Sequence, residues 1–124
     1  MTVPFEAPEV TLPLRAIVLG AATQGWYQAD DAERGEVILP ALVAAMRDWQ
    51  AMGARLIASL DDDLFMVGEP RSTGFSWYLM FEIPSLDIAA AMVQRFRAGG
   101  DGARLDRFFR LEIRFGRPFF PLER

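Results

Sequence analysis

The sequence predicts a single α+β domain whose elements follow in the order strand, helix, strand, strand, helix, strand. Two segments, 39–52 and 86–96, carry apolar residues every three or four positions, the period of a helix with one buried face. The segment 75–83 is rich in aromatic residues and 105–115 alternates, and both features are typical of strands. The length of 124 residues fits one domain with a core of its own.

The first strand is expected over 14–23, a mostly apolar segment. It contains the small residues Gly20 to Ala22, which suit a central strand that its neighbours approach closely. A polar loop is expected at 24–34, and it carries Trp26 and Tyr27.

The first helix is expected to begin near Gly35 and to run to about Met52, where Gly53 stops it. Pro40 must then lie in or near the first turn, because a proline deeper in the helix would kink it. The apolar stripe that should face the core consists of Leu39, Leu42, Val43, Met46, Trp49 and Met52.

The second strand is predicted over 54–60. The acidic residues Asp61 to Asp63 interrupt it, and 64–67 is a further short strand-like run. Glycine and proline at 68–74 predict a turn, after which 75–83 forms the third strand.

The second helix should begin at Ser85, whose side chain can cap the helix, and it should end at Gly99-Gly100. The last strand is predicted over 105–115. With right-handed crossovers, this order folds into a ferredoxin-like, four-stranded antiparallel sheet with both helices on one face. The residues 14–124 form this domain, and 1–13, with three prolines, form an extended N-terminal arm.

The composition excludes several kinds of chemistry. The chain has no cysteine and no histidine, and all 13 basic residues are arginine. Disulfides, His-ligated zinc or haem, Ser-His triads and Lys Schiff bases therefore cannot form within it, and a general base would have to be Asp, Glu or Tyr. No cofactor is expected. The lack of cysteine fits a cytoplasmic protein.

The charge and hydropathy of the chain limit its partners. A net charge of -4 has the wrong sign for binding a phosphate backbone, so nucleic acid is not expected. No uncharged apolar run approaches the roughly 20 residues of a membrane helix. The hydrophobic share of 52% is high for a small monomer and favours a homodimer. Consecutive residues of an extended segment point in opposite directions, so Asp61 to Asp63 are expected to be a solvated corner, and no metal is predicted.

One face of the predicted sheet lies under the helices and the other is open. Because residues two apart in a strand point the same way, the apolar sets of the third and fourth strands must lie under the helices, and the mixed sets face the other way. The same alternation, less clean in the second strand, places Arg55 and Ile57 on the open face. The candidate ligand-binding residues on this face are Ser59, Asp61, Tyr78, Met80, Glu82, Arg110, Glu112 and Arg114.

Two interpretations of this face remain open. Charges among aromatic and thioether groups can form a ligand pocket, in which Glu82 or Glu112 against Arg110 orients a carboxylate or carbonyl ligand. Alternatively, Arg and Glu form ordinary cross-strand pairs on a solvated face. The aromatic residues Trp26 and Tyr27 could likewise form a lid over the pocket, or pack against the start of the helix.

The segment from Trp49 to Phe96 resembles the dimeric α+β barrel superfamily, in which two ferredoxin-like protomers press their sheets together around enclosed pockets. Met52 to Ile57, which runs from helix into strand, and Tyr78 to Asp87, which runs from strand into helix, carry this likeness. The resemblance implies a homodimer with its pocket on the open sheet face.

Within that superfamily the chain looks most like the small proteins encoded with bacterial indole-3-acetate breakdown, and more distantly like YciI-type proteins. Leu60 to Gly68, Arg107 to Arg110 and Gly116 to Phe119 carry the closer likeness. YciI-type proteins are associated with a His-Asp pair, which a chain without histidine cannot form. Haem-using relatives are excluded because their axial histidine is absent here.

The resemblance and the open face together suggest a cofactor-independent protein of aromatic catabolism that binds a small aromatic or carbonyl metabolite and isomerises it. Glu82 would be the base, Arg110 would hold an anion, and Tyr78 would stack on the ligand or donate a proton. Two alternatives are a non-catalytic binding or accessory protein and a structural dimer without a cavity.

Overall fold

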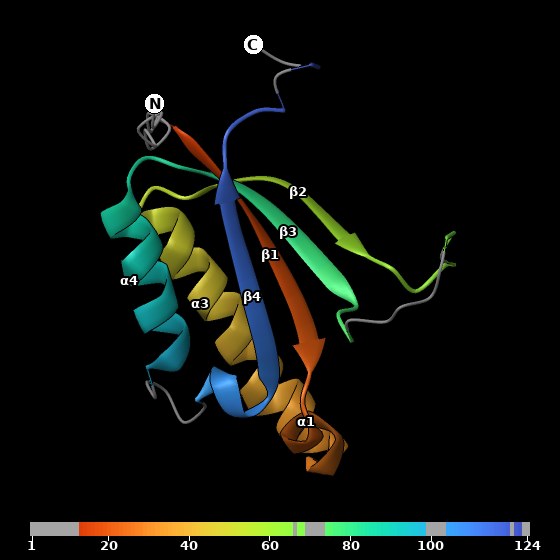
Figure 1. The fold of residues 1–124 in the computed structure, drawn as a ribbon. Helices are drawn as coiled ribbons and strands as arrows, with labels where there is room; N and C mark the ends of the chain where they lie inside the picture. The colour runs from red at the N-terminus through yellow and green to blue at the C-terminus, as the bar shows by residue number, and fades with distance from the viewer. Residues whose placement is uncertain (1–12, 66, 69–73, 99–103, 120, 123–124) are drawn as a thin grey trace, which may run out of the picture.

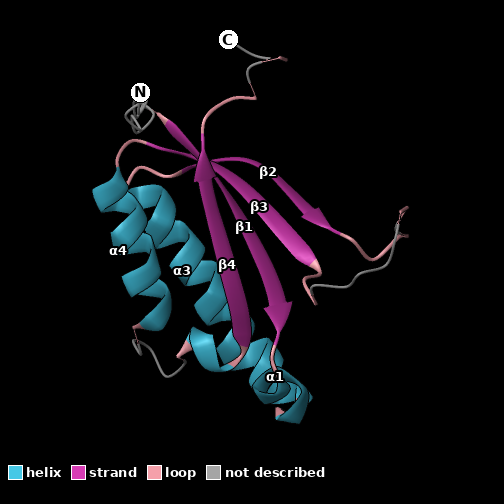
Figure 2. Cartoon of the chain, viewed as in Figure 1, coloured by secondary structure: helices cyan, strands magenta, loops and turns pink. Residues whose placement is uncertain are grey.

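The computed structural model describes residues 13–65, 67–68, 74–98, 104–119 and 121–122. It contains one four-stranded sheet in the order β2-β3-β1-β4, with every neighbouring pair antiparallel. Two long helices cover one face of the sheet (Figures 1 and 2). The predicted α+β, ferredoxin-like fold is confirmed. The main elements are β1 (Leu14–Ala22), α3 (Leu39–Ala51), β2 (Arg55–Asp61), β3 (Trp77–Ile83), α4 (Leu86–Arg97) and β4 (Phe109–Gly116).

The segment predicted as a loop after β1 is helical. It consists of short α1 (Gln24–Gln28) and α2 (Asp31–Glu33) and a π-helical turn, η1 (Arg34–Ile38), that continues into α3. Pro40 stands in the first turn of α3, as expected. Because proline has no N–H and its ring presses on the preceding turn, the wider π turn just before it accommodates Pro40 without ending the helix.

The second helix begins as predicted. Ser85 is its N-cap, and its Oγ accepts a hydrogen bond of 3.3 Å from the N–H of Ile88. The helix ends at Arg97, and the predicted stop at Gly99-Gly100 lies outside the described residues.

Two predicted strands differ from the structure. The last one begins at Phe109 instead of Leu105, because Leu105–Arg107 forms a 3-10 turn, η3, that buries the Leu105 side chain. The prediction of a strand-like run at 64–67 is wrong, because Leu64, Phe65 and Val67 are not in a strand and their side chains are highly exposed.

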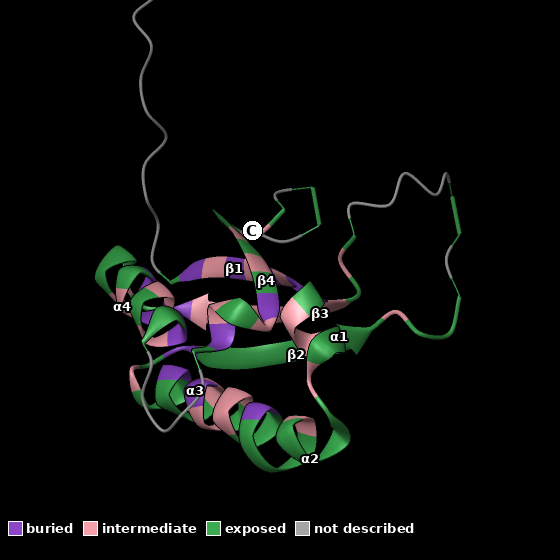
Figure 3. Ribbon diagram, turned by 90° about the horizontal axis from the view of Figure 1, so that it is seen from below, coloured by how far each residue is buried: buried purple, intermediate pink, exposed green. Residues whose placement is uncertain are grey.

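The core lies between the sheet and the two helices. Trp49 of α3 is fully buried, and its ring meets Phe81 of β3 edge-on at 5.7 Å. The indole Nε1–H donates a 2.9 Å hydrogen bond to the carbonyl of Met92 in α4, which satisfies the buried polar atom. This contact ties α3, α4 and the sheet together. By contrast β2, at the edge, is exposed along its whole length (Figure 3).

Gly20 of β1 lies directly beneath the ring of Trp77, its partner across the β1–β3 pair. A Cβ at this position would overlap the indole ring. The small residue therefore lets Trp77 lie flat on the central strand and reach Phe109, whose ring centroid is 6.1 Å away. The expectation that neighbours approach the end of this strand closely is confirmed.

Replacing Gly20 with alanine should destabilise the fold by about 1–3 kcal/mol, because the added methyl group must displace Trp77 from a packed core. Gly35→Ala is the matched control. No atom lies within 4 Å of a Cβ at Gly35, and alanine in a helix is favoured over glycine, so this variant should gain up to about 1 kcal/mol. Urea unfolding of the two variants tests the pair, and equal stabilities would contradict the packing argument.

Candidate functional site

The open face of the sheet is set by the register of β1 with its two neighbours. Ile17 pairs with Met80 of β3 and with Arg114 of β4, and Leu19 pairs with Tyr78 and with Glu112. Paired residues point to the same side, so these side chains share one face. Ile17, Leu19, Tyr78 and Met80 are half-buried, whereas Glu112 and Arg114 are exposed. The face therefore has an apolar centre and a charged border along β4.

The predicted positions of Ser59 and Asp61 are wrong. β2 carries a bulge at Ile57, because Leu56 pairs with Phe81 while Ala58 pairs with the next residue back, Met80. The extra residue reverses the alternation, so Ser59 lies opposite Leu79 and Asp61 opposite Trp77, on the helix side. Ala58 and Leu60 take their places on the open face.

Ser59 and Asp61 instead line a hollow of about 460 Å³ between β2 and α3. Most of its remaining lining is apolar, with Leu42, Val43 and Met46 from the helix stripe and Leu60, Trp77 and Leu79 from the sheet, which indicates incomplete covering of the edge strand. A second hollow on the helix side, about 510 Å³, lies between α4 and β4 and is lined mainly by apolar side chains, with Arg97, Asp106 and Arg110 among its polar ones. Among the residues that the structure describes, no three acidic side chains lie where they could hold a metal ion.

Glu82 is held by a cross-strand ion pair with Arg55, the kind of Arg–Glu pair expected in the second interpretation of this face. Both Nε and Nη2 of Arg55 donate to its Oε2, at 3.2 and 2.5 Å. On its other side Glu82 pairs with Arg15 in the register of β1 and β3. The carboxylate thus lies between two arginines on neighbouring strands, the arrangement in which cross-strand charges stabilise a sheet.

The predicted pairing of Glu82 with Arg110 does not occur within one chain. Glu82 lies opposite Arg15, near the start of β1, whereas Arg110 lies opposite Ala21 near its end. Six residues along a strand correspond to about 20 Å. Glu112, the other predicted partner, pairs with Arg114 at 2.9 Å.

Tyr78 donates its phenolic hydrogen to Oδ2 of Asp62 at 2.9 Å. This hydrogen bond, with desolvation and the charge of Asp62, raises the pKa of Tyr78 above its ordinary value of 10.0. The phenol therefore stays neutral and anchors the start of the β2–β3 connection to the open face. Tyr78 and Glu82 are four residues apart on one strand, about 13 Å, with Met80 between them.

Arg110 is positioned by an aromatic contact. Its guanidinium lies 4.7 Å from the ring centroid of Phe75, a cation–π distance. Gly74, at a φ of 77°, brings the chain so close that a Cβ there would lie 2.9 Å from Nη2 of Arg110. Phe75 and Arg110, with Leu111, Glu112 and Arg114, line a hollow of about 500 Å³ on the open side of β4.

A second hollow of about 440 Å³ lies at the other end of the same face, where β1 begins and β4 ends. Arg114 borders both hollows, which makes them neighbours. Of the residues that line this hollow, Met80 and Arg114 were predicted from the sequence and the others were not. The alternation of side chains along β1 could have placed Arg15 and Ile17 in this hollow. The segment after β4 has no such periodicity, so the positions of Arg117 and Phe119 could not be predicted in this way. The side chains that define this hollow are Arg15, Ile17, Met80, Arg114, Arg117 and Phe119.

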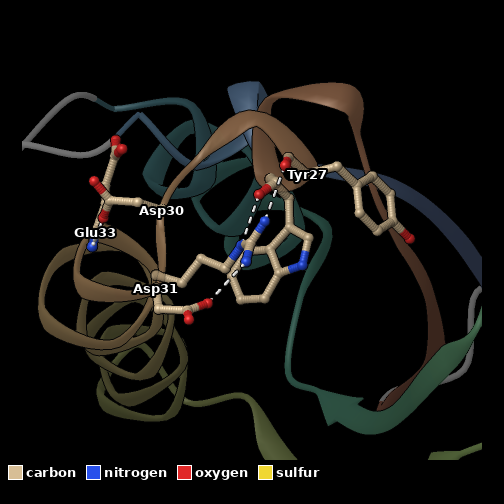
Figure 4. A network of polar contacts seen from close by, with 6 residues as sticks. Tyr27, Asp30, Asp31 and Glu33 are labelled. Atoms are coloured by element: carbon tan, nitrogen blue, oxygen red, sulfur yellow. Dashed lines mark hydrogen bonds and ion pairs between the residues drawn. The ribbon is translucent and has the colours of Figure 1, made fainter.

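Trp26 belongs to the helix-side core and does not cover the open face. Its ring lies 5.4 Å from that of Phe109, and Arg34 stacks on it at 5.5 Å. The Arg34 guanidinium also donates to the carbonyls of Trp26 and Tyr27 at 2.8 and 2.9 Å and to Asp31 at 3.2 Å (Figure 4). Of the two interpretations, packing against the helix start is the one observed for Trp26. The side chain of Tyr27 is 69% exposed.

No protein-family model and no curated protein matches this sequence. Among solved structures, the chain is similar to a crystal structure described as a putative chlorite dismutase, with a TM-score of 0.56 and 19% sequence identity. The match covers 86% of this chain but 45% of that chain, so this chain spans less than half the length of its neighbour. None of the described helices is long and apolar enough to cross a membrane. The similarity shows the ferredoxin-like α+β fold.

Ultraviolet titration of phenol absorbance tests the Tyr78–Asp62 hydrogen bond. In a Tyr27→Phe background Tyr78 is the remaining tyrosine, and it should ionise above 10.0. Asp62→Asn should lower this pKa, because it removes the acceptor charge. Since the folded state favours the neutral phenol, stability should fall as the pH rises from about 10 towards the raised pKa. Identical titrations with and without Asp62 would contradict the contact.

Proposed function

We propose that the open sheet face binds a small aromatic or carbonyl metabolite, and that the sheet of a second copy covers it. One observation supports this proposal most strongly: two neighbouring hollows that share Arg114 flank an apolar centre and are bordered by arginines. Ligand sites of small molecules combine apolar walls with a few placed polar groups in this way, at volumes of roughly 300–1,000 Å³.

The apolar centre of the face is the reason to expect a second copy. Ile17, Leu19 and Met80 remain half-exposed in the single chain, and Leu60 at the β2 end is 62% exposed. Each Å² of such surface removed from water contributes about 25 cal/mol. A second sheet placed here would bury the centre and leave the charged border around the ligand.

The biological setting comes from the resemblance of the sequence. The likeness to proteins of bacterial indole-3-acetate breakdown suggests an aromatic ligand and a cytoplasmic, cofactor-independent role in aromatic catabolism. The fold by itself is compatible with many functions. Indole-3-acetate and its neutral analogues are therefore suitable first probes.

Binding without chemistry is better supported than isomerisation. Glu82 is engaged by Arg55, and the Tyr78 hydroxyl is engaged by Asp62. At about 13 Å apart along β3, these two groups cannot act as base and acid on the same carbon of a small ligand within one chain. We therefore assign Glu82 and Tyr78 to positioning the site, and we propose a binding or accessory protein.

Light scattering coupled to gel filtration tests the covered face. The wild-type chain, of 13.9 kDa, should elute with about twice that mass. Leu19→Glu should yield a monomer, because it places a charge at the centre of the apolar face. Leu86→Glu is the control, since Leu86 is 56% exposed on α4, and it should remain a dimer. A dimer in both variants would show that another surface pairs.

Nuclear magnetic resonance tests binding against catalysis. Indole-3-acetate should transfer saturation from the wild-type protein, and it should be recovered chemically unchanged after prolonged incubation. Leu19→Glu should abolish the transfer. Conversion of the ligand by wild-type protein, lost in Glu82→Gln, would instead restore Glu82 as a base and contradict the non-catalytic role.

A further inference from the structure

We propose that the chain segment that follows β2 is an arm that packs against the second copy of the protein. Among the residues that the structure describes, the arm consists of 62–65 and Val67. This inference rests on the proposed function, because it assigns a further contact to the dimer that covers the open face. It gives a role to Leu64, Phe65 and Val67, which are not in a strand.

The arm exposes three large apolar side chains. Leu64, Phe65 and Val67 are 88%, 80% and 89% exposed, and they occupy three of four consecutive positions. Single apolar residues on a surface are ordinary, whereas a concentration of them marks a contact with another molecule. The exposure of these side chains therefore favours a partner outside the chain.

Three hydrogen bonds hold the base of the arm to the sheet. Tyr78, on the open face, donates its hydroxyl to Oδ2 of Asp62, and the Asp62 N–H donates to the carbonyl of Ser76, both at 2.9 Å. The N–H of Ser76 in turn donates to the carbonyl of Gly20, also at 2.9 Å. In Figure 3 the described part of this connection lies beyond the end of β2, on the side of the sheet away from α3. The arm therefore leaves the sheet on the side that the second copy is proposed to cover.

The apolar surface of the open face leads directly to the arm. Leu19 of β1 pairs with Tyr78 of β3, and Tyr78 pairs with Leu60 of β2, so their side chains form one row across three strands. Leu60 stands two residues before Asp62, and its side chain is 62% exposed. A partner that covers the centre of the face therefore also meets the arm, and the same second copy can bury both.

The arm is long enough to reach a facing sheet. Sheets that pack face to face lie about 10 Å apart, and an extended residue spans about 3.3 Å. Phe65 follows Asp62 by three residues, so its Cα can lie up to about 10 Å from the fixed base of the arm. In a two-fold dimer each copy gives one arm and receives one, so every contact of the arm occurs twice.

Sedimentation equilibrium of the full chain over a range of dilutions tests the arm. Phe65→Ser and Leu64→Ser should each raise the dissociation constant of the dimer about tenfold or more, because buried apolar surface is lost at two places. Leu86→Ser is the matched control. Leu86 is 56% exposed at the start of α4, on the helix side of the sheet, and its replacement should leave the dissociation constant unchanged.

Urea unfolding of a monomer gives a second measurement. In the Leu19→Glu background, Phe65→Ser should leave the free energy of unfolding unchanged, because the Phe65 side chain is largely exposed in its own chain. A loss of stability there would show that the arm packs within one chain, and it would overturn the inference.

The two interfaces can fail separately. Dimers as tight as wild type in both arm variants, with Leu19→Glu monomeric, would overturn the arm while leaving the proposed function standing. A monomeric wild-type protein would instead remove the second copy, so that the proposed dimer fails and the arm with it.

Discussion

The position of β1 between β3 and β4 is the constraint on which the rest of the structure depends. Both neighbours pair with it over most of its length, so its alternation fixes the two faces of the sheet. Gly20 lies under Trp77 on the helix side, where its lack of a side chain leaves room for the indole ring. Ile17 and Leu19, which alternate with the helix-facing residues of β1, are then directed to the open face. The core and the candidate site are thus two consequences of one register.

The charged groups of the open face follow from the same register. Cross-strand neighbours pair Glu82 with arginines on β1 and β2, and the carboxylate is fixed by that pairing. Glu112 is likewise held by Arg114 on β4. Carboxylates engaged in this way beside an apolar centre favour binding over acid–base chemistry. The distances along the strands, about 13 Å between Tyr78 and Glu82, lead to the same conclusion.

The sequence was sufficient to predict the faces of β3 and β4, because their alternation is regular and the apolar sets are unambiguous. It failed at Ser59 and Asp61, since one extra residue in β2 reverses the alternation and the local composition does not mark the bulge. The predicted association of Glu82 with Arg110 also failed. Strand alternation assigns a face but not a position along the strand, and only the register shows that these residues lie at opposite ends. The hollow beside Arg117 was missed because the chain beyond β4 has no periodicity to read.

A crystal structure of the protein grown with indole-3-acetate tests the central claim most directly. We expect two sheets facing each other through Ile17, Leu19 and Met80, with the ligand between them. An open face that lies in solvent without ligand, or two sheets packed together without any hollow, would contradict the account and indicate that this face serves pairing alone or neither purpose.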